Sequence, residues 1–145
     1  MGAFNLWNKI LTNIASITLS NTTILSHGLI QISGSIAGDS GGLTTVYTLP
    51  AGSPDLDPVR IKVECVGGSG ISGPLVGSLG TGAAVDDIMP STSFTGLTSP
   101  GLVWEAPLIG LVKRCVAGDV ISFNISTPVT GTTPLYRVTI FGEYL

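Results

Sequence analysis

Hydrophobic and polar residues alternate through most of the chain. The clearest run is VRIKVEC (59–65), in which Val59, Ile61, Val63 and Cys65 are separated by charged residues. Strict alternation indicates a β-strand with one buried and one wet face. The same period recurs, between turns rich in Gly, Pro and Asp, in residues 29–36, 43–49, 120–126 and 136–144. About eight strands, with no helical pattern after the first 20 residues, predict an all-β, antiparallel, jelly-roll-like sandwich.

An immunoglobulin-like sandwich is the alternative architecture. It would place a tryptophan between two cysteines in a characteristic position near the first of them. Here Trp104 lies close to the second cysteine, Cys115, and far from Cys65. This spacing favours the jelly roll.

Residues 67–101 are dense in Gly, Ser, Thr and Pro, and their periodicity is weak. We predict one or two short strands there within long surface loops. Long loops on a rigid β scaffold often carry contacts to partners. A connector without a partner is the alternative.

The first residues follow a different pattern, with apolar residues three and four apart. Over residues 4–15 this spacing predicts a short helix whose apolar stripe consists of Phe4, Trp7, Ile10, Leu11 and Ile14. A helix of about 12 residues is marginal alone in water, so its stripe needs a surface to cover it. We therefore divide the chain into an N-terminal attachment arm (1–20) and a β-sandwich domain (21–145). A first β-strand, or a helix packed on its own core, is the alternative.

Charged residues make up only 10% of the chain, and its net charge is −3. Ser, Thr, Gly and Asn take the place of the usual charges, so little repulsion keeps copies apart and assembly is favoured. Lys113 and Arg114 are the only adjacent basic residues, which argues against a nucleic-acid partner. The chain contains no stretch of about 18 apolar residues, so no membrane span is predicted. The N-terminus lacks the features of a signal peptide.

Cys65 and Cys115 lie in strand-like runs, and their spacing matches no metal signature. We expect two reduced, half-buried thiols, although a single bridge between them remains the alternative.

The sequence GDSGG (38–42) resembles the residues around the nucleophile of chymotrypsin-like proteases, with Ser40 as the candidate. However, the single histidine, His27, lies only 13 residues before Ser40. No aspartate between His27 and Asp39 is available to orient the histidine, as a catalytic triad requires. We therefore predict a Gly-rich hairpin turn in which Asp39 and Ser40 bond their own backbone. No catalytic residue is assigned.

Paired carboxylates occur at Asp55/Asp57 and Asp86/Asp87, in turn-rich segments. We expect solvated turn residues, with calcium binding as the alternative. The Gly-rich stretch 67–82 has no phosphate-loop ending. We predict no cofactor and no metal site.

Four stretches resemble a known family. VYTLPAG (46–52), followed by a turn and VRIKVECV (59–66), is similar to a strand–turn–strand unit in β-sandwich domains of tailed-phage fibres and tailspikes. VISFNIS (120–126) and RVTIFGEYL (137–145) resemble the last two strands of such domains. Related small jelly rolls serve as trimeric cement or decoration proteins on phage capsids, so the resemblance implies a homotrimer and a location in the virion.

The chain has no long shaft or repeat of the kind that a fibre carries. We therefore expect a non-enzymatic cement protein that is assembled in the host cytoplasm. In this reading, residues 1–20 lie on the major capsid protein or a neighbouring subunit, and the sandwich sits on the capsid surface. The alternative is a tail-fibre module that recognises a host glycan through the 67–101 loops. A small β-sandwich hydrolase and a trimeric ligand of the tumour-necrosis-factor type are weaker rivals.

Overall fold

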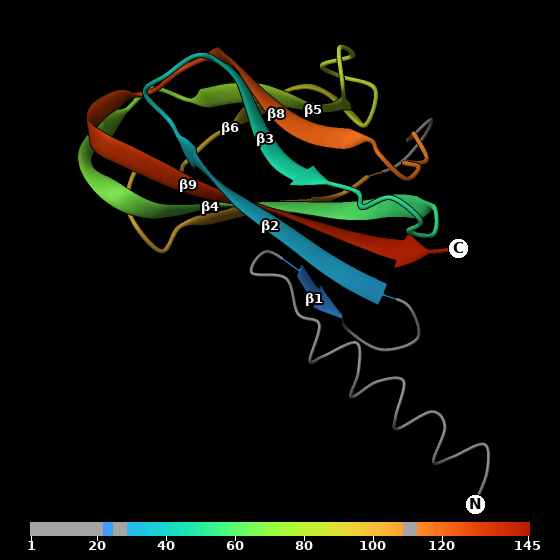
Figure 1. Ribbon diagram of the computed structural model, residues 1–145. Coiled ribbons are helices and arrows are strands. Elements are labelled where there is room, and N and C mark those ends of the chain that lie inside the picture. Colours follow the sequence, from blue (N-terminus) through green and yellow to red (C-terminus); the bar gives the residue numbers. More distant parts are fainter. Residues whose placement is uncertain (1–21, 25–28, 109–112) are drawn as a thin grey trace, which may run out of the picture.

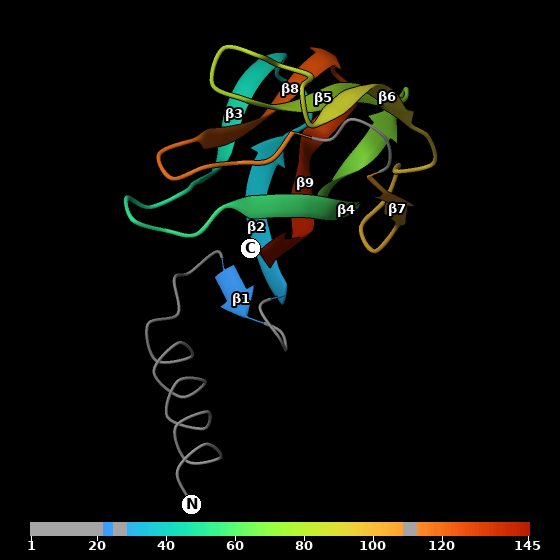
Figure 2. The ribbon, with the colours of Figure 1, turned by 90° about the vertical axis from the view of Figure 1, so that its right-hand side faces the viewer.

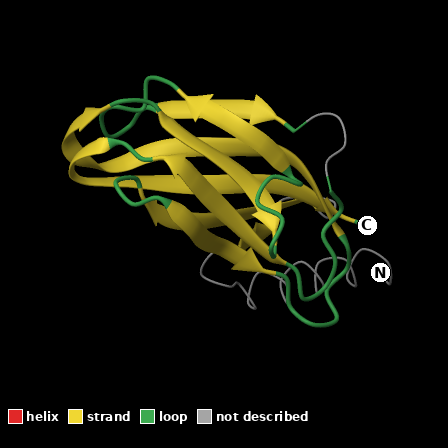
Figure 3. Ribbon diagram, turned by 90° about the horizontal axis from the view of Figure 1, so that it is seen from above, coloured by secondary structure: helices red, strands yellow, loops and turns green. Residues whose placement is uncertain are grey.

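The computed structural model describes residues 22–24, 29–108 and 113–145, and all its regular elements there are strands (Figure 3). The nine strands are β1 (Thr22–Ile24), β2 (Leu29–Ala37), β3 (Gly42–Thr48), β4 (Leu56–Ser72), β5 (Leu75–Thr81), β6 (Met89–Phe94), β7 (Val103–Pro107), β8 (Val120–Thr127) and β9 (Thr130–Tyr144). The described residues include no helix long and apolar enough to cross a membrane.

The strands form two antiparallel sheets that lie face to face (Figure 1). The five-stranded sheet has the order β1-β2-β9-β4-β7, and the four-stranded sheet has the order β3-β8-β5-β6. From β2 onward the strands pair from the two ends of the chain inward: β2 with β9, β3 with β8, β4 with β7 and β5 with β6. This is the strand order of a jelly roll, so the predicted fold class is confirmed and the immunoglobulin-like alternative is wrong.

The core lies between the sheets and uses the predicted faces. Ile61, Val63 and Cys65 on β4 are fully buried, beside Val138 and Ile140 of the neighbouring β9. The arrangement follows from alternation, because residues two apart in a strand point to the same side. The prediction for Val59 is wrong: its side chain is 40% exposed, because the register shifts at a bulge between Pro58 and Arg60.

A second bulge breaks the alternation predicted for β3. The register against β8 shifts between Thr45 and Tyr47. As a result Val46 and Tyr47 are both buried, whereas strict alternation had placed them on opposite faces.

One or two short strands were predicted within residues 67–101, and the structure has two, β5 and β6. β5 is an inner strand of its sheet, and β4 extends further than expected, to Ser72. Near that end β4 and β9 curve together towards the other sheet (Figure 1). The curve needs Gly68, which has a φ of +105°, because a Cβ there would lie 2.7 Å from the Cα of Pro134.

The GDSGG segment is not a hairpin turn, contrary to prediction. It carries the chain from β2 in one sheet to β3 in the other, and these strands pair with β9 and β8 rather than with each other. Gly38 is required because a Cβ there would lie 2.3 Å from the ring of Tyr136. Asp39 and Ser40 are exposed in the turn.

Residues 113–115 tie the two sheets together at the opposite end. Cys115 and Leu56 exchange two backbone hydrogen bonds of 2.8 Å. Arg114 Nε lies 3.1 Å from Asp57 Oδ1, and Lys113 Nζ lies 3.4 Å from Asp87 Oδ2. Asp57 and Asp87 therefore form ion pairs that link parts of the fold. The sequence predicted only solvated turn residues at these positions.

Both cysteines are free, as predicted, but they are fully rather than half buried. Cys115 is paired with Leu56 at the start of β4, and Cys65 lies nine residues further along the same strand. That separation corresponds to roughly 30 Å, far beyond the reach of a disulfide.

Candidate interaction surfaces

The predicted arm lies outside the described residues. Phe4, Trp7, Ile10, Leu11 and Ile14 therefore stay predictions, as does the boundary at residue 20. His27 is also outside the described part of the chain. The surfaces described below belong to the sandwich.

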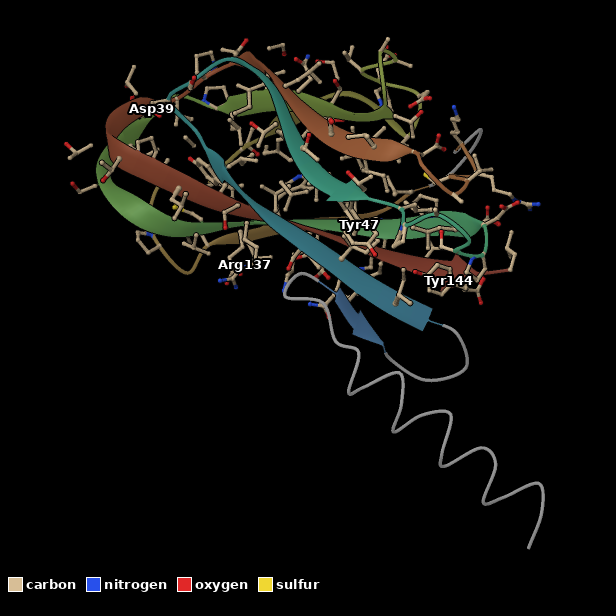
Figure 4. The ribbon with its side chains drawn as sticks, in the orientation of Figure 1. Asp39, Tyr47, Arg137 and Tyr144 are labelled. Atoms are coloured by element: carbon tan, nitrogen blue, oxygen red, sulfur yellow. The ribbon has the colours of Figure 1, made fainter. Side chains whose placement is uncertain are left out.

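The outer side of the five-stranded sheet is a charged face, formed by Arg60, Lys62, Glu64, Glu105 and Arg137. Arg60 Nε lies 3.2 Å from Glu105 Oε1, and an Arg137 guanidinium nitrogen lies 3.5 Å from Glu64 Oε2. Arg137 points away from the other sheet (Figure 4). Exposed pairs of this kind contribute about 0–1 kcal/mol each, so their main effect is to keep this face hydrated.

The outer side of the four-stranded sheet is an uncharged face. Its strands β3, β5, β6 and β8 contain no Asp, Glu, Lys or Arg. The residues that alternate outward are Leu43, Thr45, Val76, Ser78, Ser93 and Asn124. Leu43 is 53% exposed. This face can be covered by another protein without removing an ion from water, which would cost several kcal/mol for an unpaired charge.

The β5–β6 loop (82–88) folds over one part of the uncharged face. Ser78 Oγ donates a hydrogen bond of 2.6 Å to the carbonyl oxygen of Val85. The carboxylate of Asp87 accepts hydrogen bonds from the backbone N–H and the hydroxyl of Thr81, at 2.8 and 2.6 Å. These bonds fix the acidic pair Asp86/Asp87 beside the face, with one carboxylate turned inward.

The two outer edges of the five-stranded sheet are β1 and β7 (Figure 2). β1 pairs only with Ile30–Ile32, and no described strand pairs with the rest of that edge of β2. A groove of about 640 Å³ follows this edge. It is lined by Gln31, residues 33–35, Thr45, Val46 and Arg137.

The loops proposed for glycan recognition offer little exposed aromatic surface in the described residues. Phe94 is fully buried, and its ring packs edge-on against Trp104 with centroids 4.7 Å apart. Trp104 is itself partly buried against the core. The nearby groove of about 230 Å³ between β6 and β7 is mostly apolar.

The described residues offer no group of three or more His, Cys, Asp or Glu that could hold a metal. Burial, followed by the nearby Asp119 carboxylate, raises the pKa of the Cys115 thiol to about 12. A buried, protonated thiol is a poor nucleophile. The Cys115 thiol therefore offers no activated group.

The separation of charge between the two faces was not part of the sequence prediction. The signal was present, because each of the four strands is free of charge in the printed sequence. The absence of charge in these segments could not predict an uncharged face, because only the strand order places the four segments in one sheet.

No family model matches the chain, and no curated protein matches it. The fold is similar to chains in three phage capsid structures. The capsid of Ralstonia phage GP4 has a matching chain with a TM-score of 0.56 and 11% identity, over 86% of this chain and 90% of that one. The acid-stable capsid of Helicobacter pylori bacteriophage KHP30 gives 0.55 and 10%, over 84% and 92%. The asymmetric unit of the cyanophage Pam1 capsid gives 0.55 and 16%, over 100% of both chains.

Proposed function

We propose that this chain is a non-enzymatic structural protein of a phage virion. More specifically, it is a capsid cement or decoration protein that trimerises and docks on the major capsid protein. The observation that carries the proposal is the jelly-roll order of β2–β9 together with its likeness to chains of three phage capsids over at least 84% of the chain.

The distribution of charge supports a role in assembly. The uncharged face suits contact with a sister subunit or the shell, because no ion has to be desolvated there. The charged face suits exposure to solvent. A sandwich with these two faces has a preferred orientation on a particle.

The arm supplies the attachment. Burying each large side chain of its stripe contributes roughly 1.5–3 kcal/mol before ordering costs. A trimer presents three arms, and tethering raises the effective concentration of the second and third. A modest contact per arm therefore gives tight attachment.

The test is binding to empty capsids of the source phage, measured by cosedimentation, with the oligomeric state measured by sedimentation velocity. Deleting residues 2–13 should lower occupancy by roughly 100-fold, because multivalent attachment is lost. Trp7→Ser with Leu11→Ser should do the same, while Asn8→Ser with Thr12→Ser, which are outside the stripe, is the matched control.

Undiminished occupancy of the deletion variant would refute the arm. A monomer in solution that binds no capsid would refute the cement role. Binding of the isolated chain to a glycan array would instead support the fibre-module alternative, which the burial of Phe94 disfavours.

A further inference from the structure

A hollow of about 380 Å³ lies on the outer side of the five-stranded sheet, at the end where β4 and β9 curve (Figure 1). It is lined by Ala37, Asp39, Leu135 and the segments 67–68 and 133–134, all in the described part of the chain. Ala37 and Leu135 are cross-strand neighbours on this outer side, and Leu135 is 40% exposed. The hollow is therefore an open apolar surface, separate from the uncharged face on the other sheet.

Irregular pairing of β4 with β9 shapes the hollow. The register shifts on both sides of Gly67, between Cys65 and Ser69. Bulges of this kind bend a strand and are common beside functional sites. Thr133, in the lining, has a φ of +44°, and it is the one non-glycine residue with a positive φ in the described part of the chain. Strained backbone of this kind persists where the surrounding structure imposes it, and it clusters at ligand-binding positions.

Gly67 keeps the hollow open although its backbone does not require a glycine. Its φ lies outside the positive region, and a Cβ there would lie 3.4 Å from the Cβ of Leu135, which is an ordinary van der Waals contact. Packing therefore admits a side chain at position 67, beside Leu135. Its absence leaves room for a group from outside the chain.

The lining combines apolar surface with one carboxylate. Ala37, Pro134 and Leu135 supply apolar groups, and Asp39 is the one charged residue among the described residues that line the hollow. Asp39 is exposed and lies at this end of the sandwich (Figure 4). A lysine side chain has two matching parts, because its four-carbon stem covers apolar surface and its ammonium is a compact point charge. Arginine matches less well, since its five fixed donors need several acceptors.

The position of the hollow indicates that the lysine is carried by another protein. Small-molecule sites enclose most of their ligand, whereas this hollow lies on the outside of a sheet, where a free amine would be only partly covered. A lysine on a protein surface gains further contacts around the hollow.

We propose that the hollow binds a lysine side chain of a partner protein, with the stem against Leu135 and the ammonium on Asp39. The inference goes beyond the proposed function and does not depend on capsid attachment.

Titrations of the full ¹⁵N-labelled chain, followed by its amide NMR signals, test the chemistry. The probe is Nα-acetyl-lysine methylamide. The control probe, Nα-acetyl-norleucine methylamide, has the same stem without the charge. We expect the lysine probe to shift the signals around the hollow and to bind about three- to fivefold more tightly than the control, which is the gain from one exposed ion pair. Equal binding of the two probes, or shifts elsewhere, would overturn the proposal.

Two further probes test the choice of lysine and of a protein as its source. Pentylammonium has the same stem and charge as a free amine and should bind more weakly, because it lacks the peptide groups that add contacts around the hollow. The arginine analogue should also bind more weakly. Equal or tighter binding of pentylammonium would assign the hollow to a free amine, and tighter binding of the arginine analogue would remove lysine as the occupant.

Two substitutions separate the charge from the shape. Asp39→Asn should abolish the advantage of the lysine probe and leave the norleucine probe unchanged. Gly67→Val places a side chain in the hollow and should weaken both probes at least about tenfold. Ser40→Ala is the control, because Ser40 is exposed beside Asp39 but does not line the hollow. Unchanged signals in the rest of the domain report an intact fold, and lysine binding that survives Asp39→Asn contradicts the proposal.

Discussion

The hydroxyl of Tyr136 donates a hydrogen bond of 2.9 Å to the carbonyl oxygen of Leu97. Tyr136 belongs to β9 and is fully buried, and Leu97 lies in the loop between β6 and β7. One bond thus joins the central strand of the five-stranded sheet to a loop that leaves the other sheet.

Replacing this hydroxyl should destabilise the fold without changing its compactness. Tyr136→Phe leaves the buried carbonyl oxygen of Leu97 without this donor, so we expect the free energy of unfolding to fall by about 1–2 kcal/mol. Urea denaturation should show a lower midpoint with an unchanged slope. Thr130→Val removes an exposed side-chain to backbone bond and should have less than half the effect. Equal losses in the two variants would show that burial of the Tyr136 bond adds nothing.

Stability should fall at alkaline pH. Burial raises the pKa of Cys115 and of Tyr136 to about 12, from ordinary values of 9.0 and 10.0. Burial and then Tyr47 also raise the pKa of Tyr144, which lies at the same end of the sandwich as Tyr47 (Figure 4). The unfolded chain releases these protons first, so the stabilisation is complete below about pH 9 and is lost as the pH rises to about 12.

The pH dependence can be measured by urea denaturation in steps between about pH 8 and pH 12. Cys115→Ala removes one titrating group and should make the decline in the free energy of unfolding shallower, particularly just above pH 9, where the thiol of the unfolded chain ionises. A free energy of unfolding that stays constant across this interval would contradict the raised pKa values of these buried groups.

The carboxylate of Asp87 should matter more than its ion pair. It accepts two short hydrogen bonds from Thr81 and also faces Lys113. Asp87→Ala loses both bonds and should cost about 2–3 kcal/mol, whereas Lys113→Ala removes only a half-exposed pair and should cost about 0–1 kcal/mol. Thermal or urea unfolding of the two variants makes the comparison, and similar losses would assign the effect to the ion pair instead.

The uncharged face can be tested with a matched pair of exposed residues. Leu43 is 53% exposed on the uncharged face, and Val103 is 47% exposed on the charged side of the other sheet. If the uncharged face contacts a subunit or the shell, Leu43→Lys should weaken assembly at least about tenfold, because an unpaired charge is desolvated. Val103→Lys should change it by less than about twofold. Assembly is measured by sedimentation, and equal behaviour of the two variants would remove this face from the proposed interface.

Alternation predicted the sheet faces wherever both partner strands are regular. Ile61 and Val63 were placed correctly because their side chains simply follow the pleat of β4. Val59 and Tyr47 were placed wrongly because a bulge depends on the partner strand, which local sequence does not reveal.

Long-range packing explains the remaining differences. GDSGG has the composition of a hairpin turn, yet Gly38 is there because Tyr136, almost a hundred residues away, occupies the space of its missing side chain. Likewise, only the strand order shows that, among the described strands, β2 is flanked by β1 and β9. The arm residues Phe4 to Ile14 stay a prediction.

The place of β9 at the centre of its sheet also determines when the domain can fold. β9 separates β2 from β4, and its pairs join residues as distant as Leu29 and Glu143. During synthesis, β2 and β4 therefore leave the ribosome before β9, and the edges that β9 will pair with stay without their partner strand until it is made. Such non-local pairing makes folding slow and leaves the nascent chain prone to aggregation, so a translation arrest before β9 should yield insoluble fragments rather than a partial domain.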